Sequence, residues 1–171
     1  MSGSEDEGEA GAGDVVDQLL RDWRRERPDL DASAMAVVGR ILHLAGRLEA
    51  RAEEVLKPTG LSYTDLDVLA TLRRSGPPCR LKPTLLRRSV LLTSGAMTAC
   101  LDRLEARGLL TRERDPDDRR ALTAMLTDRG RELVDAAIGV RFAEAAGAVT
   151  SLNGQERDHL AALLRKMTLG L

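Results

Sequence analysis

The residues with the clearest chemical potential lie in the segment DPDDRR, residues 115–120, where two adjacent arginines follow three aspartates. Arginine binds phosphates and base edges through a planar guanidinium, and a neighbouring carboxylate aims that group through a charge-assisted hydrogen bond. A narrow minor groove attracts arginine side chains. We therefore predict that Arg119 and Arg120 enter a minor groove of DNA and that Asp118 orients one of them.

The other reactive side chains are too few and too scattered for a catalytic or metal site. Cys79, Cys100, His43 and His159 are the only cysteines and histidines, and none has CxxC or HxxxH spacing. A nucleophile motif and a phosphate-binding loop are also missing. We expect a protein that is not an enzyme and binds no metal or other cofactor. Two cysteines are too few for a disulfide framework, which fits a reducing compartment.

The composition is typical of a mainly helical, cytoplasmic protein. Leu, Ala, Arg and Glu are abundant, whereas strand-forming residues are sparse. No run of about 18 apolar residues is present and the N-terminus has no apolar signal segment, so we expect no membrane partner. The chain has one Trp, one Tyr and one Phe, too few for a platform on which single-stranded DNA or RNA could stack.

The formal net charge of −1 hides an uneven distribution. Residues 1–13 carry four acidic and no basic side chains, which predicts a disordered acidic tail. Residues 73–120 contain twelve Lys or Arg against six Asp or Glu, a local excess of six positive charges. Such a segment is either a solvated surface of mixed charge or, if the cations share one face, an electrostatic footprint for nucleic acid.

Helical periodicity organises the first third of the chain. A short helix around Trp23 is predicted to end at Pro28. A helix of about 22 residues follows as far as Pro58, and its length of about 33 Å exceeds a small domain core. Ser62 and Asp65 have the spacing of a capping box and predict the start of a further helix.

Residues 82–108 predict two short helices joined by a tight turn. Pro83 suits the first position of the first helix, and Thr93 suits the cap of the second. The second helix has an apolar stripe, and its opposite face is lined by small and hydroxyl-bearing residues, as in a recognition helix that enters a major groove. The stripe consists of Met97, Cys100, Leu101 and Leu104. The candidates for DNA contact are Thr93, Ser94, Gly95, Thr98, Ala99 and Arg103.

Two short runs rich in Thr and Leu, residues 109–114 and 121–127, predict a two-stranded ribbon with DPDDRR at its tip. This ribbon would hold Arg119 and Arg120 beside the recognition helix. Two further helices are predicted, one over about 128–149 and one from about Asn153 onward.

The predicted fold class is mainly α with a small β-hairpin wing, a winged helix-turn-helix with N- and C-terminal dimerisation helices. Helices at both ends of the chain, around a DNA-reading middle, suit a homodimer whose two-fold axis is mirrored by a palindromic duplex. The predicted segments are the acidic tail 1–13, the N-terminal helices 14–60 for dimerisation and one wall of a ligand pocket, the DNA-binding domain 61–127, and the C-terminal dimerisation helices 128–171.

From about residue 61 to 131 the sequence resembles the MarR family of bacterial winged helix-turn-helix regulators. The motifs that carry the resemblance are TSGAMT, LDRLEARGLL and RDPDDRRALTAMLT. The resemblance implies a homodimer that binds pseudo-palindromic double-stranded DNA, most often as a repressor, with recognition helices in major grooves and wing arginines in minor grooves. It also implies a pocket for a small-molecule effector.

Nearly the whole chain is similar to the PecS-like, urate-responsive branch of that family. The tryptophan of the first helix, RPDLD, DLDVLATLRRSGPP and LLTSGAMT carry this similarity. It implies a ligand site at Trp23, Asp67, position 100 and Arg112. Cys100 stands where that branch has an arginine, so a urate anion would lose a cationic partner. The implied effector is a small anionic or aromatic molecule, urate-like or phenolic.

Several of these residues have a purely structural alternative. Trp23 suits an apolar core, and Cys100 suits either a small core residue or a redox sensor. Asp67 lies between apolar neighbours and needs a partner, for which Arg112 is a candidate. For the whole chain, the alternative to a DNA-binding regulator is a winged-helix protein-interaction module without a specific DNA target. Ala99 favours that alternative, because relatives place a polar residue there.

Overall fold

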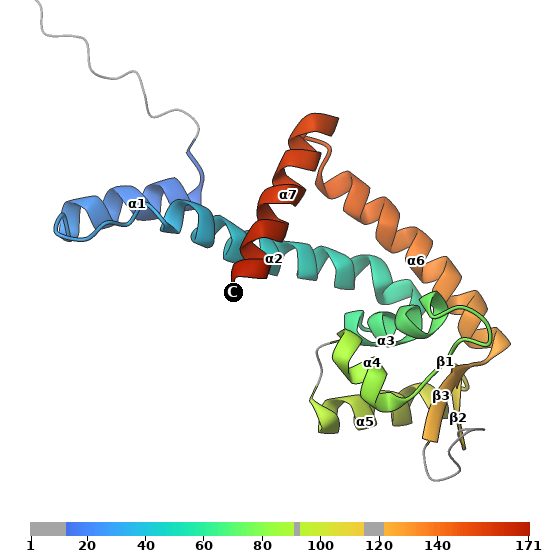
Figure 1. Ribbon diagram of the computed structural model, residues 1–171. Helices are drawn as coiled ribbons and strands as arrows, with labels where there is room; N and C mark the ends of the chain where they lie inside the picture. The colour runs from blue at the N-terminus through green and yellow to red at the C-terminus, as the bar shows by residue number, and fades with distance from the viewer. Residues whose placement is uncertain (1–12, 91–92, 115–121) are drawn as a thin grey trace, which may run out of the picture. The chain divides into compact units, whose positions relative to one another are not determined.

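The computed structural model describes residues 13–90, 93–114 and 122–171 (Figure 1). Most of these residues are helical, and three short strands form one antiparallel sheet. This arrangement confirms the predicted fold class. The predicted acidic tail lies outside the described residues except for Gly13. The chain divides into two compact units, Met1–Glu49 and Ala50–Leu171. Within the described residues, no helix combines the length and apolar character needed to cross a membrane.

In the N-terminal unit, helix α1 (Val15–Glu26) is fastened to helix α2 (Met35–Leu56) by two carboxylates. Asp14 and Asp17 form a capping box at the start of α1. Both also bind Arg40 of α2, at 2.8 Å from Asp14 and 2.7 Å from Asp17. Each carboxylate therefore caps one helix and holds the other. Because these groups are exposed to solvent, the ion pairs contribute little to stability, and their main effect is to position α1 on α2.

The C-terminal unit is organised around helix α3 (Tyr63–Arg74), whose start matches the predicted capping box. The Ser62 hydroxyl accepts from the backbone N–H of Asp65 at 3.1 Å, and the Asp65 carboxylate accepts from the backbone N–H of Ser62 at 3.1 Å. Gly60, with φ +65°, turns the chain between the short 3-10 helix Lys57–Thr59 and α3. The left-handed φ is the region that glycine adopts without steric cost.

Helices α4 (Pro83–Val90) and α5 (Ser94–Ala106) form the predicted helix-turn-helix. Pro83 is the first residue of α4, and the Thr93 hydroxyl caps α5 by accepting from the backbone N–H of Ala96 at 3.3 Å. Gly108, with φ +67°, follows the end of α5 as predicted. The predicted apolar stripe of α5 is buried along its whole length: Met97, Cys100, Leu101 and Leu104 are each at most 2% exposed.

The sheet contains the predicted ribbon and one strand that was not predicted. Strands β2 (Leu110–Arg114) and β3 (Leu122–Leu126) pair as an antiparallel hairpin, with Thr111 opposite Met125. Strand β1 (Arg80–Leu81) pairs with the other edge of β3. Two residues are too short to show the alternation that identifies a strand, so β1 depends on a distant partner rather than on a local signal.

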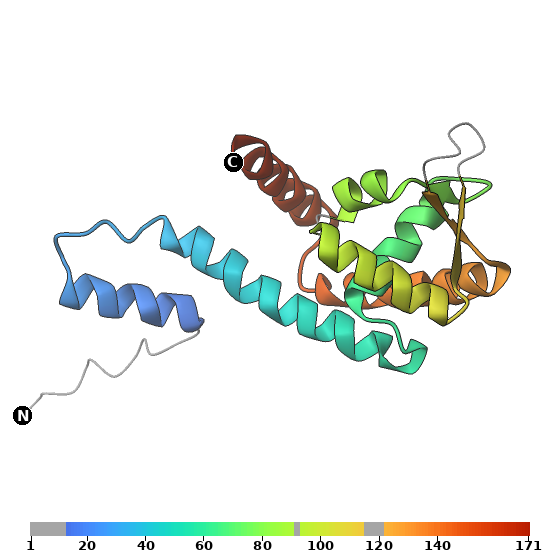
Figure 2. The same cartoon turned by 90° about the horizontal axis from the view of Figure 1, so that it is seen from below.

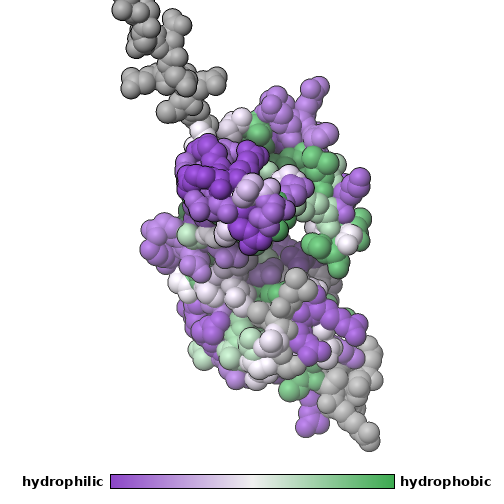
Figure 3. Space-filling view, turned by 90° about the vertical axis from the view of Figure 1, so that its left-hand side faces the viewer, coloured by the Kyte–Doolittle hydropathy of each residue, from purple (hydrophilic) through white to green (hydrophobic). Residues whose placement is uncertain are grey.

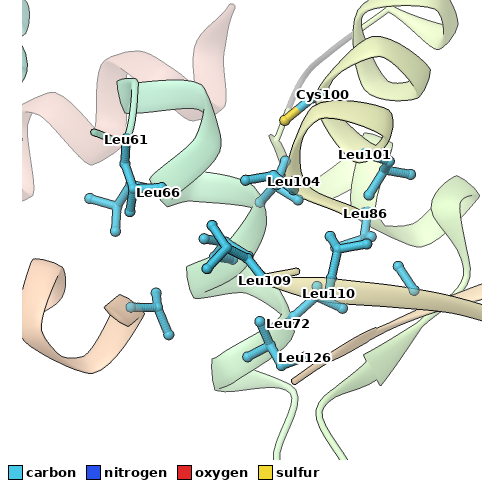
Figure 4. Packing of buried hydrophobic residues seen from close by; sticks show 14 of the residues in the cluster. Leu61, Leu66, Leu72, Leu86, Cys100, Leu101, Leu104, Leu109, Leu110 and Leu126 are labelled. Atoms are coloured by element: carbon cyan, nitrogen blue, oxygen red, sulfur yellow. The ribbon is translucent and has the colours of Figure 1, made fainter. Parts of the chain in front are cut away.

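Helix α5 leads directly into β2 (Figure 2). The leucines at this junction belong to the core of the C-terminal unit. Figure 4 shows leucines of α3, α5, β2 and β3 gathered around one another. Leu72, Leu104, Leu109 and Leu110 are at most 1% exposed. Burying a leucine stabilises a fold by about 1.5–3 kcal/mol, so this cluster is the main force that fixes α5 on α3.

Helix α6 (Asp128–Ala148) returns across α3, and helix α7 (Gly154–Gly170) follows it. Both begin close to their predicted starts, and each has a side-chain cap: Thr127 accepts from the backbone N–H of Gly130, and Asn153 accepts from that of Glu156. Glu144 of α6 is 8% exposed and is held by arginines on either side, Arg51 at 2.8 Å and Arg141 at 2.7 Å.

Gly130 is the glycine with the closest backbone contact. A Cβ atom there would lie 1.9 Å from the backbone oxygen of Leu109. We predict that Gly130→Ala destabilises the protein by about 2 kcal/mol or more, because α6 must move away from the β2 junction. The measurement is denaturant unfolding followed by circular dichroism. Gly139→Ala on the same helix is the control, since its Cβ meets nothing within 4 Å and alanine is the better helix former. Equal stability of the two variants would contradict the close contact.

Candidate nucleic-acid interface

The exposed face of α5 carries most of the residues predicted to contact DNA. Gly95, Thr98 and Ala99 are exposed, on the side opposite the buried stripe. Thr93 is exposed at the N-cap, and Ser94 is the first residue of the helix. A helix with small exposed side chains allows close approach to base edges and phosphates in a major groove.

The wing residues Asp118, Arg119 and Arg120 lie outside the described residues. The described strands nevertheless locate the two ends of the segment that carries them. Arg114 and Leu122 are paired at the last position of the described hairpin register. This far end of the hairpin lies one strand length from the end of α5.

Arg112 of β2 ties the wing to the recognition helix. Its guanidinium binds Asp102 at 2.7 Å and Glu105 at 2.5 Å, and its backbone N–H donates to Glu105 at 3.0 Å. The hydrogen bond that the Arg112 guanidinium donates to Glu105 is the main reason that the pKa of Arg112 is raised, and the same bond lowers the pKa of Glu105. The wing and α5 are therefore positioned as one piece. The expected pairing of Arg112 with Asp67 was wrong, because these two acidic residues of α5 lie closer to it.

A second carboxylate, Asp65, fastens α5 to α3. Its Oδ1 accepts hydrogen bonds from Arg103 Nη2 at 2.5 Å, Arg103 Nε at 3.2 Å and Cys100 Sγ at 3.4 Å. Burial alone raises the pKa of Asp65, but the hydrogen bonds from Arg103 and Ser62 outweigh it and leave the pKa below its ordinary value of 3.8. This pairing therefore stabilises the fold above that pH and is lost as the pH falls through the lowered pKa.

A cavity of about 330 Å³ lies between α3 and α6. Its lining is apolar and aromatic, with three charged side chains. It consists of Tyr63, Leu66, Asp67, Ala70, Arg74, Ile138, Arg141, Phe142 and Ala145. Burial raises the pKa of Asp67, and the guanidinium of Arg74, 4.0 Å away, opposes that shift. Arg141 lies over the Tyr63 ring at 5.9 Å. Such a mixture of rings and charges suits a small polar aromatic molecule.

The four residues predicted to bind an effector have different surroundings. Asp67 lines the cavity between α3 and α6, whereas Cys100 is buried beside Asp65 and Arg112 is occupied by α5 carboxylates. Trp23 is 51% exposed, so its interpretation as a core residue was wrong. The buried residues of α1 are Leu20 and Val16, about one and two turns nearer its start than Trp23. Trp23 instead lines a cavity of about 230 Å³ within its own unit, together with Arg27, Leu30, Asp31, Ala32 and Met35.

Among the described residues there is no group of three or more His, Cys, Asp or Glu side chains that could hold a metal ion. The carboxylates at the described part of the site are instead engaged with arginines. Asp65, Asp102 and Glu105 each accept from a guanidinium. The arrangement therefore positions secondary structure and presents a surface.

Comparison with known proteins decides the family. The sequence model of the MarR family matches residues 61–122, which run from just before α3 to the first residue of β3. The transcriptional regulator PecS of Dickeya dadantii is 32% identical over 152 residues, which cover 89% of this chain and 92% of PecS. The chain belongs to the MarR family. This MarR-family protein is a DNA-binding transcriptional regulator and not an enzyme.

Solved structures of similar proteins share the fold. One is BpsR of Bordetella bronchiseptica, studied for regulation of its DNA binding by 6-hydroxynicotinic acid. Its TM-score is 0.71 at 27% identity, and the match covers 81% of this chain and 98% of BpsR. Sco3205 of Streptomyces coelicolor, solved in complex with DNA, has a TM-score of 0.74 at 26% identity and covers 82% of this chain and 92% of Sco3205.

Sequence reasoning missed the partners that hold this MarR-family interface together. Asp65 was identified only as a helix cap, and its contact with Arg103 joins residues 38 positions apart. Tyr63, Arg141 and Phe142 were not singled out as cavity residues. The signal for Asp65 was present in the capping box: a carboxylate with one oxygen on a backbone N–H keeps its other oxygen for a second element.

Cys100 provides a test of this geometry. Burial, and then the negative charge of Asp65, raise the pKa of Cys100 to about 12, so the thiol stays protonated and unreactive near neutral pH. We predict that a Cys79→Ala variant reacts with a thiol reagent at pH 8 at least about 100-fold more slowly when native than when unfolded in guanidinium. The measurement is the rate of thiolate release from the reagent. Fast, stoichiometric reaction of the native protein would contradict the buried position and favour a redox sensor.

Proposed function

We propose that this MarR-family protein is a homodimeric repressor that binds a pseudo-palindromic duplex and is released by a small anionic or aromatic effector. The observation that carries the proposal is α5, which buries one stripe completely and exposes small residues on the other side. The proposed DNA contacts are Thr93, Ser94, Gly95, Thr98, Ala99 and Arg103 at the helix, and Arg119 and Arg120, oriented by Asp118, on the wing.

Exposed apolar side chains support the homodimer. Helix α7 has no buried residue within one chain, and the first half of α2 is likewise uncovered. Figure 3 shows hydrophobic side chains at the surface among hydrophilic ones. A stable monomer rarely leaves large contiguous apolar patches in water, so a second copy is their natural cover. The residues concerned are Met35, Val37, Val38, Leu42, Leu44 and Leu48 of α2 and Leu160, Leu163, Leu164, Met167 and Leu169 of α7.

The cavity between α3 and α6 supports the effector part of the proposal. Its volume of about 330 Å³ is near the lower end of the range of ligand sites, about 300–1,000 Å³, and fits a molecule of one or two rings. Tyr63 and Phe142 offer aromatic surfaces, and Arg74 and Arg141 offer positive charge to an anion. Asp67 is placed to accept an N–H or O–H of the ligand. Roles for Trp23, Cys100 and Arg112 in binding the effector stay predictions.

The regulation of BpsR by 6-hydroxynicotinic acid, a planar heteroaromatic acid, is consistent with an effector of this class for the present chain. An occupant of the cavity would bear directly on α3, since Leu66 and Asp67 of that helix line it. The neighbouring residue Asp65 holds α5. A change in α3 would therefore reach the recognition helix through Asp65 as well as through the shared core.

The experiment is a fluorescence-anisotropy titration of a labelled duplex from the intergenic region upstream of the protein's own gene, against a scrambled duplex, at several salt concentrations. We expect binding about 10³-fold tighter than to scrambled DNA. Arg120→Ala is expected to weaken binding and to reduce the salt slope by about one, because one phosphate or groove contact is lost. Light scattering on the complex is expected to give two protomers per duplex.

Urate, added to the preformed complex, tests the effector class. Release of the duplex by urate would show that Cys100 leaves a purine site intact, whereas release by 6-hydroxynicotinic acid alone would favour a smaller aromatic acid. Equal affinity for the scrambled and the upstream duplex, with a shallow salt dependence, would contradict the repressor proposal for this site and favour a protein-interaction module.

A further inference from the structure

Three donors from the recognition helix converge on one buried oxygen of α3. Arg103 Nε, Arg103 Nη2 and Cys100 Sγ all donate to Oδ1 of Asp65. The other carboxylate oxygen of Asp65 accepts from the backbone N–H of Ser62. Asp65 is 2% exposed, whereas the Arg103 side chain is 49% exposed. The inner edge of the guanidinium is therefore fixed and its outer edge faces solvent.

The arginines next to Arg103 are used differently. All three guanidinium nitrogens of Arg112 bind Asp102 or Glu105. Arg107 donates from both terminal nitrogens to the backbone oxygens of Thr59 and Gly60, in the turn that precedes α3. By contrast, the hydrogen bonds that Arg103 donates to described residues come from Nε and Nη2, and Nη1 donates none to them. Arg112 and Arg107 fasten protein to protein, and Arg103 keeps one donor edge for a ligand outside the chain.

A fixed guanidinium is a better phosphate ligand than a mobile one. An arginine loses side-chain freedom when it binds, and holding it in the bound orientation beforehand removes that cost from association. Two hydrogen bonds to one carboxylate oxygen set the plane of the group. The carboxylate itself is buried, so it lies behind the arginine and not between it and the solvent.

We propose that Asp65 is a positioning residue for DNA binding, which holds Arg103 so that its open Nη1 edge binds a backbone phosphate beside the recognition helix. The inference rests on the proposed function, since it requires α5 to meet a duplex. It gives Arg103 a phosphate contact in place of a base contact. It also makes Asp65, through Arg103, the α3 residue that sets the affinity for DNA.

The test measures duplex affinity and its salt dependence for full-length Arg103→Ala, Asp65→Ala and the double variant. Arg103→Ala is expected to weaken binding about tenfold and to reduce the salt slope by about one. Asp65→Ala is expected to weaken binding severalfold with Arg103 present and not at all in the Arg103→Ala background. A residue that only stabilises the fold would not give this dependence on background. Ser62→Ala is the matched control, because it removes a cap hydrogen bond to Asp65 and leaves Arg103 in place.

Arg103→Lys covers the case in which Asp65→Ala fails to fold. Lysine keeps the charge but cannot reproduce the planar contact with Asp65, so affinity is expected to fall while the salt slope stays unchanged. Wild-type affinity in Arg103→Lys, an unchanged slope in Arg103→Ala, or an equal effect of Asp65→Ala in both backgrounds would each overturn the inference. Absence of selective duplex binding by the wild-type protein would overturn the proposed function, and the inference with it.

Discussion

The position of α5 on α3 is the constraint on which the rest of the structure depends. Helix α5 must bury one stripe completely and still leave its opposite face open to a partner as large as a duplex. The stripe achieves this because its four residues lie at steps of three or four and are all at most 2% exposed. The core leucines of α3 and of the β2 junction close the space beneath it (Figure 4). An outward rotation of α5 would expose this stripe to water.

Hydrophobic burial opposes rotation of α5, and ion pairs near its C-terminal end add directional contacts to α3 and to the wing. Asp65 holds the α3 side through Arg103, and Arg112 holds the wing side through Glu105. Neither pair contributes much net stability, because partly exposed ion pairs are screened by solvent. Their importance is geometric: the cavity, α3, α5 and the wing root are joined by contacts between neighbouring side chains.

Local signals were sufficient to predict the helices and their caps. Thr93, the Ser62 and Asp65 capping box, Pro83 and Gly108 each act through neighbouring backbone, so their spacing identifies them. Contacts that join distant segments could not be read in this way. Strand β1 forms only because it pairs with β3, where Met125 lies opposite Arg80, 45 residues earlier in the chain. The exposure of Trp23 likewise depends on packing, because it is set by how α1 meets α2.

The candidate site also combines features that local sequence predicts with contacts between distant segments. The exposed face of α5 could be predicted from the spacing of its apolar residues, because the face opposite a buried stripe is the one open to solvent. The partners of Arg103 and Arg112 required the packing of α5 against α3 and β2, which fixes the carboxylates within reach. The branch resemblance identified Asp67, whereas Phe142 of the lining comes from α6, about 75 residues away in the sequence.

Hydrogen–deuterium exchange of the full-length protein, free and bound to its selective duplex, tests most directly whether α5 and the wing form the DNA-binding surface. The account predicts that protection on binding increases in peptides covering residues 93–126 and that the core of α3 changes little, because α3 is already buried. Protection confined to α7 or to the N-terminal unit, with residues 93–126 unchanged, would contradict it.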